Sequence, residues 1–133
     1  MQKRKTSELY EVYRELEDLA FEMNHVVDGV IVEGPHDKKT LKLLGYEGPI
    51  ITRSGKRSHV ELAEFVAKKF SRVVVLTDFD EAGKDQNRRL TKLLETKRVK
   101  VEQVYRRKFQ RLLKEARIFT IEAICRIKLE LFG

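Results

Sequence analysis

Two aspartates and a glutamate follow apolar runs in this sequence, and their types and spacing suit the binding of a metal ion. Asp78 and Asp80 follow the run VVVLT, and Glu33 follows VIV. Residues two apart on an extended chain point the same way and lie about 6.6 Å apart, so both aspartates can reach one cation. Oxygen ligands select a hard ion such as Mg²⁺, which also keeps waters and binds phosphate oxygens. The sequence predicts Asp78 and Asp80 as metal ligands, and Glu33 as a third ligand or as a general acid or base.

A different role is open for one of these aspartates. Asp is common after strands as a turn former or a helix cap, so Asp80 could cap the helix that we expect from about Ala82. The neighbouring Glu81 fits a solvated residue in the first helical turn, where the helix dipole favours a negative charge.

Strands and helices alternate around these residues. Short β-branched runs predict strands at residues 26–34, 50–52, 72–77 and 99–104. Helical spacing predicts helices over residues 7–24, 36–45, 58–70, 82–96 and along the tail from about 105, with a final helix from Thr120. In the helix after the capping box Ser58–Glu61, we expect Val60, Ala63, Phe65 and Val66 to be buried.

The alternation predicts an α/β fold with a central, mostly parallel, four-stranded sheet flanked by helices, with extra helices at both ends. The carboxyl ends of parallel strands share one edge of the sheet, where ligands bind. Glu33, the loop TRSGKR and the two aspartates should therefore meet there.

The first helix has one apolar stripe, formed by Leu9, Val12, Leu16, Leu19 and Met23. The stripe could pack against its own domain or pair with a partner helix, which would make a homodimer.

The segments VIVEGPHDKKTL and VVVLTDFDEAGK together resemble the two signatures of the Toprim domain, a Glu-Gly and an Asp-x-Asp that each follow a strand. The resemblance implies Mg²⁺, with Mn²⁺ as a substitute, held by Asp78 and Asp80, and it implies Glu33 as general acid or base and potential ligand. Asp37 and Gly83 match further family positions. We expect an N-terminal helix over 1–25, a Toprim domain over 26–104 and a basic helical extension over 105–133.

The chain carries a formal charge of +7, which favours a polyanionic partner, nucleic acid first and a membrane surface second. Candidate phosphate-binding residues are Arg53, Lys56 and Arg57 after the second strand, Lys84, and Arg107, Lys108, Arg111 and Lys114 in the tail. Each group could instead be a solvated face, and Lys38 and Lys84 could simply neutralise the acids. His36 and His59 have no matching ligand cluster and are expected at the surface.

Other features exclude some classes of protein. No apolar stretch is long enough to span a bilayer, and the start lacks the apolar core of a signal peptide, so we expect a cytoplasmic protein with no membrane partner. The lone Cys125 forms no internal disulfide and is expected in the core.

These features favour Mg²⁺-dependent hydrolysis of phosphodiester bonds in RNA or DNA. In size and motif the chain is most similar to the Toprim branch that contains nucleases and the maturase of 5S ribosomal RNA. A second reading is a nucleic-acid-binding module, in a ribonucleoprotein or a repair or replication complex, in which the metal bridges to phosphate and no bond breaks. A third and less favoured interpretation is a phosphatase, because Ala82 occupies the position where the Asp-x-Asp phosphatase pattern has Thr or Val.

Overall fold

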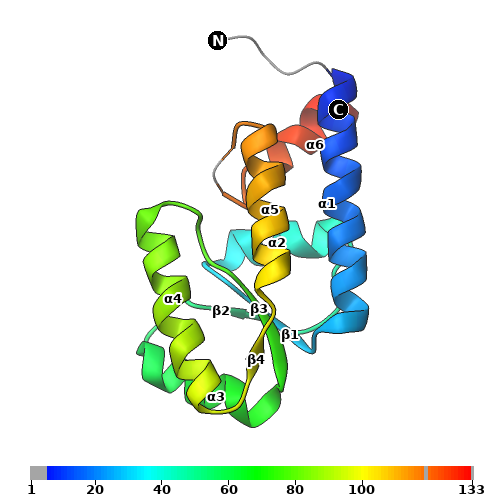
Figure 1. Cartoon of the computed structure of the whole chain (residues 1–133). Helices are drawn as coiled ribbons and strands as arrows, with labels where there is room; N and C mark the ends of the chain where they lie inside the picture. The colour runs from blue at the N-terminus through cyan, green and yellow to red at the C-terminus, as the bar shows by residue number, and fades with distance from the viewer. Residues whose placement is uncertain (1–5, 119, 133) are drawn as a thin grey trace.

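Four short strands form a single parallel sheet at the centre of the molecule (Figure 1). The computed structural model describes residues 6–118 and 120–132. The strands are β1 (Gly29–Val32), β2 (Ile50–Thr52), β3 (Arg72–Leu76) and β4 (Lys100–Val101). Their order in the sheet is β2-β1-β3-β4, and every neighbouring pair is parallel. The predicted α/β architecture is confirmed, with a sheet that is wholly parallel.

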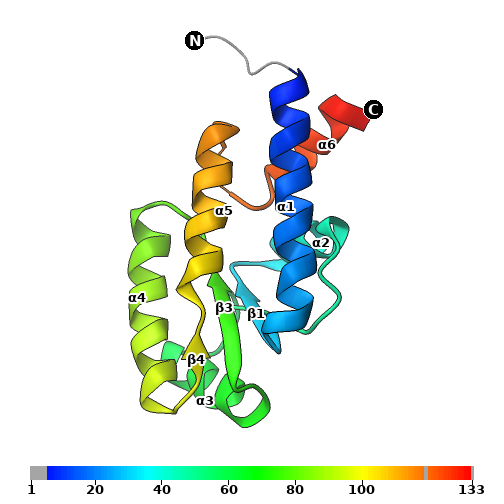
Figure 2. The ribbon, with the colours of Figure 1, turned by 45° about the vertical axis from the view of Figure 1, so that its right-hand side comes forward.

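In the part of the chain that the structure describes, six helices surround the sheet in two layers. They are α1 (Thr6–Val26), α2 (Pro35–Leu44), α3 (His59–Lys69), α4 (Glu81–Thr96), α5 (Gln103–Glu115) and α6 (Ile124–Phe132). Helices α3 and α4 cover one face, while α1, α2, α5 and α6 lie on the other (Figures 1 and 2). Within the described residues, no helix combines the length and apolar character needed to cross a bilayer.

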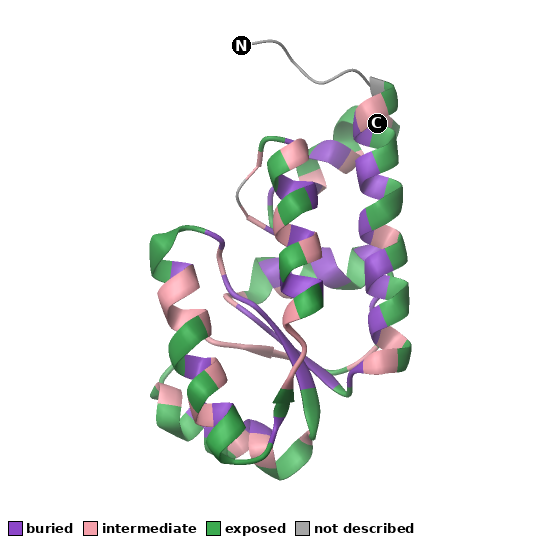
Figure 3. Ribbon diagram, viewed as in Figure 1, coloured by how far each residue is buried: buried purple, intermediate pink, exposed green. Residues whose placement is uncertain are grey.

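The alternation of side chains along the strands divides the core into these two layers. Val30 and Val32 of β1 face the cluster formed with α1, α2, α5 and α6, whereas Ile31 between them faces α3 and α4. In β3, Val74 and Leu76 face the first cluster and Val75 the second. Both central strands are buried on both faces, which explains their continuous apolar sequence (Figure 3).

The apolar stripe of α1 packs within its own chain. All five predicted stripe residues are buried, and Leu16 and Met23 are fully buried. Helix α1 contacts both α5 and α6, and the Tyr13 and Phe132 rings lie edge to face with centroids 5.6 Å apart. Packing against the same domain is therefore confirmed, and a homodimer would have to use another face of this helix.

A carboxylate before β1 aligns the two central strands. Asp28 accepts hydrogen bonds from the backbone N–H groups of Ser71 and Arg72, both at 2.9 Å, and from the Ser71 hydroxyl. Burial alone would raise the Asp28 pKa, but these hydrogen bonds outweigh it and hold the pKa below its usual value. The ionised carboxylate thereby joins the start of β1 to the start of β3.

Three expected boundaries are wrong for local reasons. The first strand begins at Gly29 instead of residue 26, because helix α1 continues to Val26. The last strand ends at Val101 instead of residue 104, because Glu102 serves as the N-cap of α5 and Gln103 already begins that helix. The final helix begins at Ile124 instead of Thr120, because residues 120–123 form a turn in which the Thr120 hydroxyl accepts from the Ala123 N–H.

One core assignment is also wrong. Val60 is 50% exposed, while Leu62 is buried in its place. In α3 the buried positions are Leu62, Ala63 and Val66, and Val60 lies outside this face. Phe65, also expected to be buried, is half-buried against the same cluster. Cys125, expected in the core, is half-buried.

Truncating Leu16 should reveal how firmly α1 belongs to the core. We expect Leu16→Ala to lower the free energy of unfolding by about 2–5 kcal/mol, because the cavity would lie in a fully buried layer. The control Leu129→Ala removes the same atoms from a side chain that is 65% exposed and should cost less than about 1 kcal/mol. Urea denaturation followed by circular dichroism measures both; equal small effects would contradict the packing of α1.

Candidate metal centre

The carboxyl edge of the sheet holds a small acidic pocket. Glu33 directly follows β1, and Asp78 lies two residues beyond the end of β3. Val32 and Leu76 are paired in register, so these two carboxylates leave neighbouring strands at the same edge. The pocket has a volume of about 230 Å³, and its polar lining is formed by Glu33, His36, Asp37, Ser54, Asp78, Thr120 and Glu122.

The Asp-x-Asp segment alternates between the core and the surface. Phe79 is 7% exposed and belongs to the cluster shared with α1, α2 and α5. Asp78 is half-buried at the pocket, and Asp80 is exposed. The buried ring between the two aspartates fixes the turn, and it explains the apolar residue at the middle of the motif.

Asp80 caps helix α4, as the alternative reading of the sequence expected. Its Oδ1 atom accepts a hydrogen bond from the Gly83 N–H at 2.8 Å. Only this oxygen takes part in the bond, so the cap leaves the second oxygen free to bind a cation. Glu81 is solvated, and its nearest basic group is Lys84 Nζ at 3.8 Å.

Gly83 lets α4 approach the backbone of Asp78. A Cβ atom at position 83 would overlap the Asp78 carbonyl oxygen, while the buried Thr77 hydroxyl donates to the Gly83 carbonyl at 3.0 Å. The small residue of the motif is thus a steric requirement of the fold. Gly34 differs, because a Cβ there would meet only the Ser54 hydroxyl at 3.6 Å.

Glu33 is held by an arginine from the neighbouring strand. Arg53 Nε lies 2.7 Å from Glu33 Oε2, and a second guanidinium nitrogen contacts the same oxygen. Val32 pairs with Thr52, and the ladder continues as the Arg53 N–H donates to the Val32 carbonyl. The strand register therefore places Arg53 beside Glu33. The sequence analysis considered Lys38 and Lys84 as the residues that neutralise the acids, but at Glu33 this residue is Arg53.

Asp78 is the carboxylate that remains without a partner. No residue in the described part of the chain donates a hydrogen bond to it. Burial raises the pKa of Asp78, and the charges of Asp37, Glu33 and Asp80 raise it further, while Arg53 opposes them. This accumulation of negative charge is what a bound cation would relieve.

Arg106 is a structural residue of the site that the sequence analysis missed. It is 5% exposed, and its guanidinium donates to the backbone carbonyls of Val75, Thr77 and Asp78 at 3.2, 2.9 and 3.0 Å. The guanidinium carbon also lies 4.5 Å from the centroid of the Phe79 ring. The sequence did contain a signal that Arg106 is buried, because it lies three residues before Phe109 on the apolar stripe of α5.

Asp37 joins the pocket to the C-terminal segment. Its carboxylate accepts from the Gly34 N–H at 3.0 Å and from the Glu122 N–H at 3.2 Å, which caps α2 and anchors the turn before α6. Burial raises the pKa of Asp37, although both hydrogen bonds oppose the shift. Asp37 therefore has a structural role. It also holds Glu122, which was not among the predicted site residues, at the pocket.

The other predicted basic residues lie outside the pocket. Lys56 and Arg57 are exposed on the loop after β2, and the Arg57 guanidinium stacks over the Phe65 ring at 3.8 Å. Lys84 lies in the first turns of α4. The predicted basic face of α5 is exposed at Arg107, Arg111 and Lys114 and half-buried at Lys108, and none of these residues lines the pocket. The two histidines differ, since His36 is exposed whereas the Nε2 atom of His59 is buried without a hydrogen bond.

The donor set fits a hard cation in its chemistry. Within residues 6–118 and 120–132, no three acidic, histidine or cysteine side chains converge closely enough to hold a metal as they stand. Mg²⁺ needs only one or two protein carboxylates, and Asp78 with the free oxygen of Asp80 supplies them. A third carboxylate requires Glu33 to exchange Arg53 for the metal.

The fold and the two acidic motifs are those of a known class of domain. Residues 29–112 match the Toprim domain, and the chain belongs to this family. Toprim domains in general bind Mg²⁺ and carry out metal-dependent phosphoryl transfer on nucleic acids. The resemblance seen in the sequence is thereby confirmed at the level of the family.

Relatives of similar sequence include several UPF0292 proteins. A UPF0292 protein of Thermococcus onnurineus is 32% identical over 79% of this chain and 77% of its own length. A UPF0292 protein of Thermococcus sibiricus is 34% identical over 79% of this chain and 82% of its own. A solved structure, a putative protein from Aquifex aeolicus, superposes with a TM-score of 0.61 at 28% identity, covering 85% of this chain and 94% of that one.

Alanine at the two motif glycines should separate their roles. We expect Gly83→Ala to lower the free energy of unfolding by about 2 kcal/mol or more, since α4 or Asp78 must move. Gly34→Ala should change it by less than about 1 kcal/mol, because the space is open and the backbone angles are allowed. Thermal unfolding compares the two variants, and equal losses would contradict the close approach at Gly83.

Removing Arg53 should strengthen metal binding. In Arg53→Met the Glu33 carboxylate loses its ion pair and becomes available, so we expect Mg²⁺ to bind about tenfold more tightly, which corresponds to about 1.4 kcal/mol. The control Arg57→Met removes the same charge from the same loop without touching Glu33. Isothermal titration with Mg²⁺ or Mn²⁺ gives both affinities; weaker binding in Arg53→Met would show that Glu33 is not a ligand.

Proposed function

We propose that this protein is a metal-dependent nuclease that hydrolyses phosphodiester bonds in RNA or DNA. The observation that carries the proposal is the Asp78 carboxylate, which lies unpaired in an acidic pocket with Glu33 at the edge of a Toprim sheet. The similarity in size and motif to the branch of small Toprim nucleases and the maturase of 5S ribosomal RNA supports hydrolysis. A positive net charge supports a nucleic-acid substrate.

Each acidic residue has a separate task in this proposal. Asp78 and Asp80 hold the cation. The hydrogen bond from the Gly83 N–H keeps the Asp80 carboxylate fixed at the N-terminus of α4. A bound Mg²⁺ supplies a Lewis acid that polarises the scissile phosphate. Glu33 accepts a proton from the attacking water as a base, or donates one to the leaving oxygen as an acid. Either role requires that the Glu33 carboxylate is released from Arg53.

Arg53 gains a second role when Glu33 is released. Its guanidinium is only 27% exposed and stays at the edge of the pocket because β2 fixes its backbone. An arginine in this position can bind a phosphate oxygen of the substrate with two parallel hydrogen bonds. Substrate and metal would therefore replace the Glu33–Arg53 ion pair together.

A nucleic-acid-binding module without hydrolysis is the second candidate. Glu33, the proposed acid or base, is already hydrogen-bonded to Arg53, and no three ligands converge in the described residues. If that ion pair persists with substrate bound, Asp78 and Asp80 would hold a cation whose charge attracts the phosphate, and no group would be free for proton transfer. Binding would then weaken steeply with salt while the strand stayed intact.

A cleavage assay tests the proposal directly. We expect end-labelled RNA or DNA to be cut in Mg²⁺ or Mn²⁺, and not in EDTA. Glu33→Gln and the double variant Asp78→Asn with Asp80→Asn should each lower the rate by at least about 100-fold, as expected for loss of acid–base or metal catalysis. Glu81→Gln removes the charge of a neighbouring solvated glutamate and should leave the rate unchanged.

The outcomes separate the two candidates. Cleavage that survives the double aspartate variant would place the activity elsewhere. Intact strands under conditions where a mobility shift shows binding would favour the binding module.

A further inference from the structure

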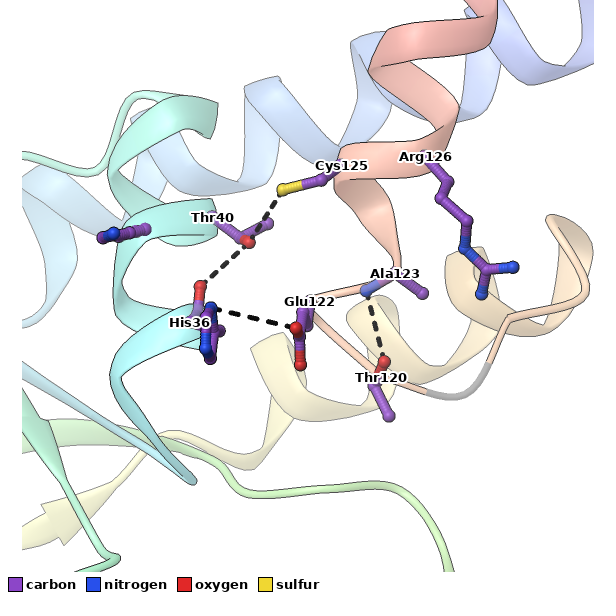
Figure 4. A pocket seen from close by; sticks show the side chains of 8 residues that line it. His36, Thr40, Thr120, Glu122, Ala123, Cys125 and Arg126 are labelled. Carbon is purple, nitrogen blue, oxygen red and sulfur yellow. Dashed lines mark hydrogen bonds and ion pairs between the residues drawn. The ribbon is translucent and has the colours of Figure 1, made fainter.

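A second, larger pocket adjoins the acidic pocket. It lies between α2 and the segment that leads into α6, and its volume is about 530 Å³ (Figure 4). His36, Thr120 and Glu122 line both pockets. The two cavities are therefore neighbouring compartments of one surface depression, and a chain-like ligand can occupy both.

Buried polar groups hold the walls of this second pocket in place. The Thr40 hydroxyl lies 3.2 Å from Cys125 Sγ, which joins α2 to α6, and Thr40 is 1% exposed (Figure 4). The Glu122 N–H donates to the buried carboxylate of Asp37, and the Ala123 N–H donates to Thr120. The pocket is therefore preformed, because its two walls are hydrogen-bonded to each other.

The charges of the two pockets are opposite. The acidic pocket contains Glu33, Asp37 and Asp78. The second pocket is lined by Lys39 and Arg126, and neither forms an ion pair with another described residue. The single acid of the second pocket, Glu122, lies at the junction, 3.8 Å from His36. A ligand that bridges a cation and two free basic groups must carry negative charges at intervals.

We propose that the second pocket binds a backbone phosphate of a single-stranded nucleic acid whose neighbouring phosphate lies at the carboxylates. Lys39 and Arg126 contact the bound phosphate, and the substrate class is thereby single-stranded RNA or DNA. The pocket has the volume of a site for one small ligand, so it can admit one nucleotide of an unpaired strand. This inference rests on the proposed function for the second phosphate, but the phosphate pocket itself can be tested without cleavage.

Binding in EDTA tests the inference. The probes are a fluorescein-labelled 12-nucleotide single strand and the same strand in a duplex, with anisotropy measured across salt concentrations. We expect tighter binding of the single strand, and about a tenfold loss of that affinity in the double variant Lys39→Ala with Arg126→Ala. The slope of log affinity against log salt should fall by about 0.7, since both side chains contact one phosphate and each single-strand phosphate contact contributes about 0.7.

A matched control distinguishes the pocket from net charge. Lys42→Ala with Lys128→Ala removes two charges from the same two helices, at positions that do not line the pocket. We expect this variant to keep the affinity of the parent protein, with unchanged thermal unfolding in both double variants. Equal losses in both variants, or tighter binding of the duplex, would overturn the inference.

The cleavage assay then separates this inference from the proposed function. If strands bind with the expected pattern but stay intact, the phosphate pocket stands and the nuclease proposal fails. If strands are cut and the pocket variant binds and cuts like the parent protein, the nuclease proposal stands and the phosphate pocket fails.

Discussion

The buried guanidinium of Arg106 is the interaction on which the carboxyl edge depends. It binds three backbone carbonyls at the point where β3 ends, and it stacks on the ring between the two aspartates. Burial lowers the pKa of Arg106 to about 10, which still leaves the group charged near neutrality. A charge buried in this way must keep its partners, because loss of one side of such a network costs about 3–5 kcal/mol. The turn after β3 is therefore fixed by a residue of α5 that lies 28 to 31 positions further along the chain.

Two arginines thus act on the acidic edge in different ways. Arg106 lies beneath the turn, shielded from solvent, and its hydrogen bonds go to backbone carbonyls and the Thr77 hydroxyl, so no carboxylate is bonded to it. Arg53 lies at the rim and binds the Glu33 side chain, so a cation or a phosphate can compete for either partner. The first fixes where Asp78 is placed, and the second can exchange partners when ligands arrive. The acidic pocket can tolerate its clustered carboxylates because both arginines lie close to them.

The sequence predicted the parts of this site that local rules determine. Apolar runs end where strands end, so Glu33 and the two aspartates could be assigned to one edge, and the short-range cap of Asp80 was also foreseen. The Glu33–Arg53 pair was not foreseen, because it depends on which strands are neighbours and in which register. Arg106 and Asp37 were missed as structural residues for a similar reason, because each binds a partner that lies far away in the sequence, at 28 positions for Arg106 and 85 for Asp37. Val60 is an error of a local kind. It was assigned to the buried face because it is apolar, but its angular position around α3 places it outside that face.

The packing of α1 has a consequence for how the protein is made. This helix emerges first among the described elements during synthesis, yet its apolar stripe is covered by α5 and α6, which emerge last. Domains of this kind fold as a unit, and contacts between distant segments form late. The growing chain must therefore carry an uncovered apolar helix until the whole sheet has been translated and α5 and α6 have followed it. Protection of that helix by the ribosome surface or by a chaperone would set the yield of folded protein.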